Sequence, residues 1–579
     1  MKSFLELKKN LKRDHSHLKT VKLAILGDTA TQLLVQAIQG FGFETGYYFD
    51  VFEADYDQID RQILDASSEL YQFEPDFTLI FYSSPKLLQK FYKLDNAGKE
   101  VFAQKHIEHI TSLYQSIVSS LKSKVLVMNY PEIDDAVFGN YANKTNLSFV
   151  YQLRRINLGI MDLSQKLNNL FIVDLSLQQG HFSADFMTDR KVYVSTDIIF
   201  SIDFLPYAAK NIVDVISATL GVFKKCIVLD LDNTLWGGII GEDGIENIQI
   251  GDLGLGKAFT EFQRWLKELK QRGIILAVCS KNDENNAKEP FIKHPDMVLK
   301  LKDIAVFVAN WENKADNIKY IQSILNIGFD AMVFFDDTPF ERSMVKTSLP
   351  EITVPELPED PVEYLPYLRS LNLFETASFT AEDGQRTKLY QEEAHRTIVQ
   401  MQSANEDDFL AALNMYSDVK GFDKFNTPRV AQLTQRSNQF NLRTVRYTDE
   451  DISRLAQDNS FINISFTLAD RFGEYGLISA VVLEKQSGAL FIDTWIMSCR
   501  VLKRGMETFV LNAIVDAARR EGIDQIIGEY IPTAKNGMVK EHYKNLGFKP
   551  VDSVDSRWQL KASEYQDIRT HISVKCVDA

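Results

Sequence analysis

The sequence has few cysteines for its length. Only four occur among its 579 residues, and they are widely separated, at Cys226, Cys279, Cys499 and Cys576. No CxxC pair is present, so the spacing indicates neither a zinc site nor a disulfide framework. We therefore expect a reducing compartment and domains that fold through hydrophobic cores.

Long apolar runs and an excess of positive charge are also missing. No run approaches the roughly 18 apolar residues of a membrane-spanning helix, and the charged start MKSFLELKKNLKRDHSH lacks the apolar region of a signal peptide. Lys and Arg number 64 against 79 Asp and Glu, which gives a net charge of −15. Since nucleic acids and anionic membranes select basic surfaces, we expect neither as a partner. The interpretation is a cytoplasmic protein.

What the chain does contain is a long alternation of apolar and amphipathic segments. With 579 residues, the chain is too long to form a single domain, because domains typically have roughly 100–200 residues. Short apolar runs alternate with helical patterns in the first part, which predicts a parallel sheet with helices on both faces. These runs are 21–27, 77–82, 124–130 and 170–175.

Two further units follow. A second α/β pattern begins near residue 225 and ends in a proline-rich segment, 349–367. Residues 376–400 have the pattern of one polar helix, and a third unit with long strands runs from about 406 to the end. We predict domains at 1–220, 221–372 and 373–579, the last preceded by the polar linker helix.

Polar residues follow the apolar strands of the middle unit and begin one of its helices. They are, in chain order, Asp230, Asp232, Ser280, Lys314, Asp336 and Asp337. The carboxyl ends of parallel strands meet at one edge of a sheet, where such sheets bind ligands. Several carboxylates in one cleft repel each other, and a hard cation such as Mg²⁺ removes that repulsion.

Asp230 and Asp232 lie two positions apart and so share a face of the strand end. One can attack a phosphoryl group while the other transfers a proton, and a hydroxyl and an ammonium, as on Ser280 and Lys314, suit phosphoryl oxygens. An isolated Asp-x-Asp after a strand is more often a turn and a helix cap. The complete ordered set instead indicates a magnesium-dependent phosphoryl site.

The segments DLDNT, VCSKND, NKADNI and FFDDTPFER resemble the four motifs of the haloacid dehalogenase (HAD) phosphatases. VLDLDNTLWGGIIGEDG more narrowly resembles the FkbH-like family, whose studied members load a glyceryl unit from 1,3-bisphosphoglycerate onto an acyl carrier protein. The resemblance implies Asp230 as nucleophile, Asp232 as general acid and base, and Lys314 as a catalytic cation. It implies a Mg²⁺ site at Asp230, Asp232, Asp336 and Asp337, and substrate contacts from Thr234, Ser280, Lys281 and Asn282.

The third unit resembles the GNAT acyltransferases in EHYKNLGF, and that fold receives pantetheine. The segment CRVLKRGMET keeps only one glycine of the GNAT phosphate loop. We expect Arg500, Lys503, Arg504 and Gly505 to bind the carrier, with Arg519 adding charge to the docking surface. The alternative is a GNAT-like fold with no acyl transfer of its own, or an ordinary solvated helix face.

The first unit resembles SGNH hydrolases in LAILGDTATQLL, with Thr29 in place of the nucleophilic serine. Asp174 and His181 are present, but not at the family's Asp-x-x-His spacing, and Asn129 lacks the usual preceding glycine. Threonine is a hindered nucleophile. We therefore expect a degenerate docking domain that does not hydrolyse.

A thiol is a natural carrier for an acyl group taken from an acyl phosphate. Cys279 is the predicted nucleophile because it precedes Ser280 at a strand end, and a buried core cysteine is the alternative. Cys499 is a second candidate, while Cys226 lies within a strand and is expected in the core.

The sequence thus predicts an α/β protein of three domains: a flavodoxin-like SGNH-type unit, a Rossmann-like HAD core and an α+β GNAT-like unit. The predicted enzyme uses Mg²⁺ to release phosphate from a small acyl phosphate and loads the acyl unit onto an acyl carrier protein. Two alternatives stay open: a small-molecule phosphatase without acyl transfer, and a non-catalytic scaffold that docks a carrier.

Overall fold

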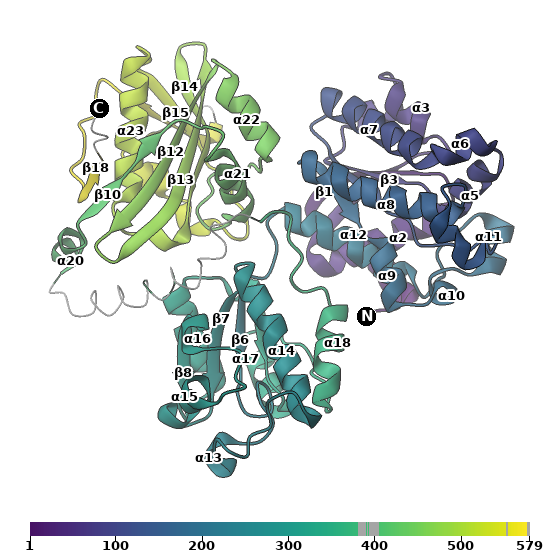
Figure 1. The fold of residues 1–579 in the computed structure, drawn as a ribbon. Coiled ribbons are helices and arrows are strands. Elements are labelled where there is room, and N and C mark those ends of the chain that lie inside the picture. Colours follow the sequence, from purple (N-terminus) through teal and green to yellow (C-terminus); the bar gives the residue numbers. More distant parts are fainter. Residues whose placement is uncertain (380–389, 391, 393–404, 552–553, 576–579) are drawn as a thin grey trace. The chain divides into compact units, whose positions relative to one another are not determined.

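The computed structural model describes residues 1–379, 390, 392, 405–551 and 554–575. The chain forms two compact units, Met1–Thr219 and Leu220–Ala579, which we describe separately (Figure 1). Most of the linker helix predicted at 376–400 lies outside the described residues.

The first unit contains a five-stranded sheet whose paired strands all run parallel. Its order is β2-β1-β3-β4-β5, which is the flavodoxin-like order that the resemblance implied. The strands are β1 (Lys19–Gly27), β2 (Tyr47–Glu53), β3 (Phe77–Phe81), β4 (Lys124–Met128) and β5 (Leu170–Val173). The apolar runs predicted four of these strands; β2 was not predicted.

Helices cover both faces of this sheet (Figure 1). One face packs on α3, α4, α5, α7 and α8 through a shared core, while α1, α2 and α12 contact one another. The helices are α1 (Phe4–Asn10), α2 (Gln32–Thr45), α3 (Ile59–Leu64), α4 (Glu69–Phe73), α5 (Ser84–Tyr92), α6 (Asn96–Glu100), α7 (Phe102–Ser120), α8 (Phe149–Lys166), α9 (Leu175–His181), α10 (Ala184–Met187), α11 (Arg190–Thr196) and α12 (Leu205–Thr219).

The second unit begins with a four-stranded parallel sheet in the order β8-β7-β6-β9. The strands are β6 (Cys226–Leu229), β7 (Ile275–Ser280), β8 (Val306–Ala309) and β9 (Met332–Phe335). The helices that follow them are α13 (Ile240–Asp243), α14 (Gly254–Gln271), α15 (Glu284–Lys293), α16 (Lys314–Leu325), α17 (Pro339–Ser348) and α18 (Tyr364–Ser370). Alternate residues of β6 enter two different cores, one shared with α14 and the other with α16, so the sheet is buried on both faces.

In the described part of the chain after residue 404, the second unit contains a nine-stranded mixed sheet. Its long central strands β12, β13 and β14 are antiparallel, and β14 pairs with β15 in parallel. The strands are β10 (Met415–Ser417), β11 (Val419–Lys420), β12 (Phe461–Asp470), β13 (Gly473–Gln486), β14 (Ala489–Met497), β15 (Gln525–Glu529), β16 (Lys549–Val551), β17 (Val554–Lys561) and β18 (Ile572–Val574).

Helices pack on this sheet through two separate cores, one containing α23 and the other α21 and α22. The helices are α20 (Glu406–Ala412), α21 (Thr427–Arg436), α22 (Asp449–Gln457), α23 (Met506–Arg520) and α24 (His542–Asn545). The α/β class predicted from the sequence is confirmed. None of the helices in the described ranges is both long and apolar enough to cross a membrane.

Candidate functional site

The carboxylate cluster lies where β6 and β9 end. The two strands are parallel neighbours, with Leu229 of β6 opposite Phe335 of β9. Asp230 and Asp336 are the next residues along each strand, so the paired register brings them to the same edge of the sheet. Asp230 donates its backbone N–H to the carbonyl of Phe335 at 2.9 Å, which extends the ladder to the site itself.

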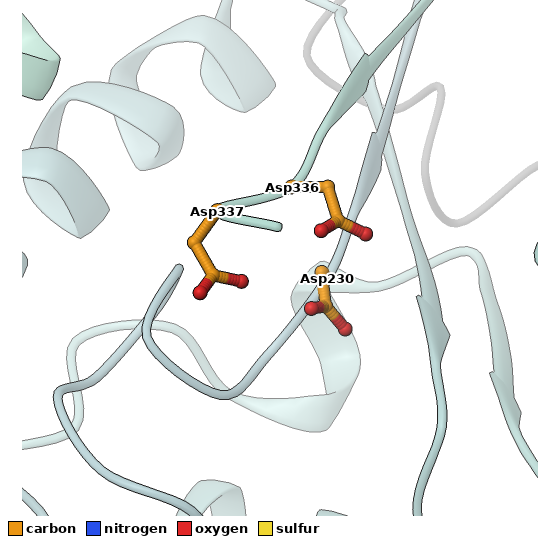
Figure 2. Close-up of side chains that lie close together, drawn as sticks. All are labelled: Asp230, Asp336 and Asp337. Atoms are coloured by element: carbon orange, nitrogen blue, oxygen red, sulfur yellow. The ribbon is translucent and has the colours of Figure 1, made fainter. Parts of the chain in front are cut away.

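Three carboxyl groups face a common space at this edge, those of Asp230, Asp336 and Asp337 (Figure 2). One oxygen from each lies within 4.8 Å of the other two. Asp230 is 6% exposed and Asp336 is fully buried. Three carboxylates at this spacing and depth repel one another strongly unless a cation or protons reduce their charge.

Lys314 supplies part of that compensation. It is the first residue of α16, and its Nζ lies 2.6 Å from Asp336 Oδ2 and 3.0 Å from Asp230 Oδ2. Burial alone would lower the pKa of the Lys314 ammonium, but Asp230 and Asp336 outweigh it and raise that pKa above its ordinary value. Lys314 is therefore a permanent positive charge between two acids.

One ammonium does not balance three carboxylates. Burial, followed by the charge of Asp230, raises the pKa of Asp336 to about 7. The same two causes raise the pKa of Asp337. With all groups ionised, three carboxylates and one ammonium leave a charge of −2. An oxygen-lined, buried and doubly negative group fits a hard divalent cation.

Backbone contacts hold the two aspartates after β9 in place. Arg342 Nη1 donates to the carbonyl oxygens of Asp336 and Asp337, at 2.8 and 2.6 Å. Asp337 donates its N–H to Thr234 Oγ1 at 3.2 Å, and Thr338 donates its N–H to Asp336 Oδ1 at 2.9 Å. Thr234, predicted to contact substrate, is fully buried and here positions the loop that carries Asp337.

Arg342 is a positioning residue that the sequence did not reveal, although it belongs to the FFDDTPFER motif. The motif indicated that its aspartates are functional. The amino-acid sequence alone does not show whether an arginine lies on the surface or is buried, and Arg342 is only 5% exposed.

The carboxylate of Asp232 is directed elsewhere. Its Oδ1 accepts hydrogen bonds from Trp236 Nε1 at 2.9 Å and from the Ile240 N–H at 3.0 Å. Its Oδ2 accepts from Asn282 Nδ2 at 2.8 Å. Asp232 is not part of the three-carboxylate group found among the described residues. The expectation that its side chain binds the metal is corrected, because its oxygens are occupied by three donors.

A turn after β6 causes this difference. Asn233 has a left-handed backbone, with φ of 54°, and its Oδ1 accepts from the Gly238 N–H at 2.9 Å. Asparagine tolerates this conformation better than most residues. The turn sends Asp232 towards Trp236 while Asp230 stays in the cleft.

The end of β7 places Ser280 and Asn282 beside Asp232. Both are nearly buried, and Asn282 Nδ2 lies 3.3 Å from Ser280 Oγ. These two side chains and Asp232 form one polar row, and their assignment to substrate binding stays a prediction. Lys281 instead directs its Nζ to Glu341 Oε1 at 2.6 Å, so its charge is already paired.

Cys279 does not lie in the cleft as a free thiol. Its side chain is completely buried in the core that contains α16, and its Sγ lies 3.7 Å from the Lys314 carbonyl. Burial is the main cause that raises the pKa of its thiol far above the ordinary range. A buried, protonated thiol is a poor nucleophile, which corrects the predicted catalytic role of Cys279.

The other cysteines differ in exposure. Cys226 is fully buried, as expected of a core residue, and Cys499 is partly exposed. Cys499 lines a cavity of about 440 Å³, with Gln439, Phe440 and Lys535 among its other walls. Cys576 lies outside the described residues.

The predicted carrier-binding residues do not form one surface. Lys503 is exposed, and it and Gly505 have left-handed backbones, with φ of 62° and 76°. Arg504 is only 6% exposed, and its guanidinium lies over the rings of Phe409 and Tyr475. The expectation that Arg504 faces a carrier is corrected, because its charged group is inside the fold. Nothing is described of the Arg500 side chain.

Arg519 was expected to add to this basic surface. Its guanidinium instead pairs with Asp567 at 2.9 Å, so its charge is locally neutralised. Among the predicted docking residues whose side chains the structure describes, Lys503 is exposed.

A segment of the chain fills the space where β14 and β15 separate. These strands pair only over Ala489–Phe491. Beyond that point, Met497 of β14 donates its N–H to the Phe440 carbonyl at 3.2 Å, and Ile531 donates its N–H to the Leu442 carbonyl at 2.9 Å. Phe440 and Leu442 are buried in the core. An extended ligand therefore finds this interval already occupied.

The first unit does not assemble a hydrolase triad from the candidates in its sequence. Asp174 accepts from Asn129 Nδ2 at 2.8 Å and from the Leu177 N–H, which it caps at the start of α9. His181 is exposed at the end of α9. Among the described residues, no hydrogen bond joins Thr29, Asp174 and His181.

The chain is similar to a solved structure over much of its length. The crystal structure of the N-terminal part of the protein BF1531 from Bacteroides fragilis, which contains a phosphatase domain complexed with Mg, is 54% identical in sequence. The match covers 66% of this chain and 100% of that chain, with a TM-score of 0.64.

Two acetyltransferase structures match a smaller part of the chain. They are the ribosomal-protein-S18-alanine N-acetyltransferase of Escherichia coli and the spermidine N-acetyltransferase of Vibrio cholerae. Each is 13% identical and covers 26% of this chain, with a TM-score of 0.20; the shares of their own chains are 97% and 96%.

The family model described as FkbH, N-terminal domain, matches residues 22–217. A search of curated proteins found no match. The model match covers the first unit, and the identity to the BF1531 structure extends over two thirds of the chain. Together with the DLDNT, NKADNI and FFDDTPFER segments and the carboxylate cluster that they build, these matches show that the chain belongs to the FkbH-like family of the HAD superfamily.

Proposed function

We propose that the chain is a Mg²⁺-dependent phosphoryl enzyme that acts on a small acyl phosphate, releases phosphate and transfers the acyl group to an acyl carrier protein. The observation that carries the first part is the convergence of the Asp230, Asp336 and Asp337 carboxyl groups, with Lys314 paired to the two buried ones. The HAD motifs and the likeness to a phosphatase-containing structure solved with Mg support it.

The residues suit a bound Mg²⁺ because three carboxyl oxygens converge, two of them from the buried Asp230 and Asp336, and their charge is only partly compensated. Bound there, the ion would neutralise the acids and attract phosphoryl oxygens. Asp230, Asp336 and Asp337 are its proposed side-chain ligands. The proposal leaves Asp232 out of the ligand set because its oxygens accept three hydrogen bonds.

Asp230 is the proposed nucleophile. A carboxylate oxygen attacks phosphorus, the bond from phosphorus to the leaving oxygen breaks, and an aspartyl phosphate forms. Asp232 gives a proton to the leaving oxygen and then takes one from the water that hydrolyses the aspartyl phosphate. Lys314 holds its charge throughout, since two acids keep it protonated, and it attracts the oxygens of the transferred group.

The hydrogen bonds to Asp232 suit a proton-transfer role. The Trp236 and Ile240 N–H groups fix one oxygen, while Asn282 holds the other at the Ser280 side of the cleft. A fixed carboxyl group presents its proton in one direction, which lowers the entropic part of the barrier.

Acyl transfer is a separate reaction of the same substrate class. A substrate such as 1,3-bisphosphoglycerate has both a phosphoester and an acyl phosphate. A thiol attacks the acyl carbon, the bond between that carbon and the phosphate oxygen breaks, and phosphate leaves. The attacking thiol is the pantetheine of the carrier, either directly or after Cys499, the partly exposed cysteine.

The test is intact-mass analysis of the protein with 1,3-bisphosphoglycerate and Mg²⁺, with and without holo acyl carrier protein. We expect phosphate release together with a glyceryl adduct on the carrier. Phosphate release without any adduct would reject the acyl transfer and leave a small-molecule phosphatase. Absence of both would reject the proposed function, and the Asp230→Asn variant is the matched control for phosphate release.

The phosphatase without acyl transfer is the second candidate. The phosphatase domain in the related BF1531 structure favours it. Turnover of p-nitrophenyl phosphate with Mg²⁺ is expected under both candidates and would dispose of a non-catalytic scaffold.

A further inference from the structure

The cavity of about 440 Å³ beside Cys499 lies away from the phosphoryl site. Ala331, which precedes β9, lines the cavity, whereas the phosphoryl carboxylates of Asp336 and Asp337 follow the same strand. The two places are therefore at opposite ends of β9. Because the volume of the cavity falls within the roughly 300–1,000 Å³ of small-molecule sites, it is large enough to hold a ligand of its own.

Basic side chains outnumber acidic ones around this cavity. Its charged walls are formed, among the described residues, by Lys225, Arg429, Arg436, Lys535, Asp330 and Glu351. These are four cations against two carboxylates, an excess of two positive charges. The chain as a whole carries a net charge of −15, so this wall differs in sign from the molecule around it. Such a wall favours an anionic ligand.

Contacts hold these basic groups at the wall of the cavity. Lys225 Nζ donates to the Arg436 carbonyl at 2.9 Å, and Arg436 Nη2 donates to the Ser378 carbonyl at 2.7 Å. Lys535 pairs with Asp330, one of the two acids. The positive charges are thus positioned before a ligand arrives, which reduces the entropic cost of binding it.

A reactive group borders the same space. Cys499 begins a short 3₁₀ helix, Cys499–Val501, just beyond the end of β14, and Asn326 Nδ2 donates to its carbonyl at 3.0 Å. Its side chain is partly exposed and lines the cavity. A thiol that meets solvent beside a space of ligand size is placed to act as a nucleophile on what that space binds.

The other described cysteines do not share this position. Cys226 and Cys279 are fully buried, and burial raises the pKa of both thiols far above the ordinary range. The thiolate is the nucleophilic form of cysteine, so neither residue suits an acyl transfer. Cys499 therefore combines exposure with a ligand-sized cavity, which neither of these two does.

We propose that this cavity binds an acyl phosphate that carries a second anionic group, and that Cys499 takes the acyl group from it as a thioester. The inference rests on the proposed function, for which it supplies the place of acyl transfer. The basic wall attracts the second anion, such as the phosphoester of 1,3-bisphosphoglycerate, and so retains the acyl phosphate in the space that Cys499 borders.

The step needs no further reactant. The Cys499 thiol loses its proton to solvent, its sulfur attacks the acyl carbon, and the bond from that carbon to the phosphate oxygen breaks, so that phosphate leaves with the bonding electrons. The pantetheine thiolate of the carrier then attacks the thioester carbon and the Cys499 sulfur leaves. The phosphoester that remains on the acyl group is a substrate for the HAD cleft, where Asp230 attacks phosphorus.

Intact-mass analysis and peptide mapping of the full chain with 1,3-bisphosphoglycerate, without a carrier, test the covalent step. We expect the Cys499 peptide to gain one acyl group, which hydroxylamine removes as it removes thioesters. In Asp230→Asn the adduct should keep its phosphoester, because the HAD cleft no longer cleaves it. If the wild-type protein gains no adduct although a carrier added later is acylated, the proposal is overturned and the proposed function stands.

The Cys499→Ala variant assigns the adduct. It should lose the adduct and acylate the carrier at least about a hundredfold more slowly, because the nucleophile is gone, while its turnover of p-nitrophenyl phosphate with Mg²⁺ equals that of wild type. Cys576→Ala is the control and keeps the adduct. Carrier acylation at the wild-type rate in Cys499→Ala, or an adduct that only Cys576→Ala removes, would contradict the assignment to Cys499.

Failure of the proposed function gives a different result. The wild-type protein then does not turn over p-nitrophenyl phosphate, although Cys499 still gains the acyl group. The thermal midpoint of Cys499→Ala checks its folding, and if the variant unfolds, alkylation of Cys499 in the wild-type protein decides the outcome. We expect 3-phosphoglycerate, which has the anion but no acyl phosphate, to slow this alkylation by N-ethylmaleimide, and glycerol to leave its rate unchanged.

Lys535→Gln tests the basic wall in the same alkylation assay. The variant should need about tenfold more 3-phosphoglycerate for the same protection, as loss of a hydrogen bond to a charged group implies. Lys540→Gln is the matched control, since Lys540 is exposed in the same segment and does not line the cavity. Equal protection of Lys535→Gln and wild type, or no protection of wild type by 3-phosphoglycerate, would refute the anion site.

Discussion

Replacement of Lys314 by methionine tests the electrostatic logic of the phosphoryl site. Lys314 is 4% exposed and bridges Asp230 and Asp336 at 3.0 and 2.6 Å. At an effective dielectric constant near 20, each pair contributes about 5–6 kcal/mol of attraction. Removing the ammonium leaves both acids buried without it, and breaking such a buried pair costs ~3–5 kcal/mol once desolvation is included.

The loss should depend on metal. A divalent cation restores positive charge at the same carboxylates, and a ligand present at 100 times its dissociation constant stabilises by about 2.7 kcal/mol. We expect Lys314→Met to unfold at a clearly lower temperature than wild type in EDTA, and Mg²⁺ to raise its midpoint more than it raises that of wild type. Phosphate release stays low at saturating Mg²⁺, because the cation that attracts the phosphoryl oxygens is gone.

Thermal unfolding in EDTA and in a Mg²⁺ series measures this directly. Lys319→Met is the matched control on the same helix, since Lys319 is 53% exposed and pairs with Asp316 at the surface; such pairs contribute at most about 1 kcal/mol. The reasoning fails if the thermal midpoint of Lys314→Met equals that of wild type in EDTA. It also fails if Mg²⁺ raises the midpoint of the variant no more than that of wild type, because the carboxylates would then not repel one another appreciably.

Three further predictions concern catalysis, metal and carrier. Asp230→Asn should lower phosphate release by at least about three decades because the nucleophile is lost; a near wild-type rate in a phosphate-release assay would contradict this. Asp336→Asn should shift the midpoint of the Mg²⁺ titration upward more than it lowers the rate at saturating metal, and an unchanged midpoint would exclude Asp336 as a ligand. Lys503→Glu should slow carrier acylation about tenfold by placing like charges in an acidic interface, with phosphate release unchanged and Lys561→Glu as an exposed control; equal rates and equal salt dependence would reject docking at Lys503.

The sequence predicted correctly at which edge of the sheet the carboxylates gather, but it did not predict where each side chain points. Asp230, Asp336 and Asp337 follow buried strands, and their convergence follows from parallel pairing alone. Asp232 deviates because the left-handed Asn233 turn and the indole N–H of Trp236 redirect it. That turn depends on tertiary contacts, such as the hydrogen bond from Tyr364 to the Asn233 carbonyl at 3.2 Å, which no local pattern encodes.

The position of Cys279 in the core, rather than in the cleft, could have been predicted from the sequence. Successive residues of a strand point to opposite faces, so a cysteine that precedes a cleft-facing Ser280 belongs to the other face of the sheet. There it packs with α16. The burial of Arg504 could not be predicted in this way. Arg504 follows another basic residue, Lys503, and two adjacent charges indicate a surface position. The guanidinium of Arg504 is instead covered by Phe409 and Tyr475, which are distant in sequence.

The burial of Cys279 also separates the two halves of the proposed reaction. A thiol in the HAD cleft would have allowed one site to cleave phosphate and carry the acyl group. With that thiol in the core, the cleft retains oxygen and nitrogen groups only, which suit phosphoryl transfer. The acyl group must then meet a thiol elsewhere, and Cys499 is the one described cysteine that is open to a cavity. Because the interval between β14 and β15 is filled by the segment around Phe440, a pantetheine thiol would have to reach that cavity by a path other than the strand interval.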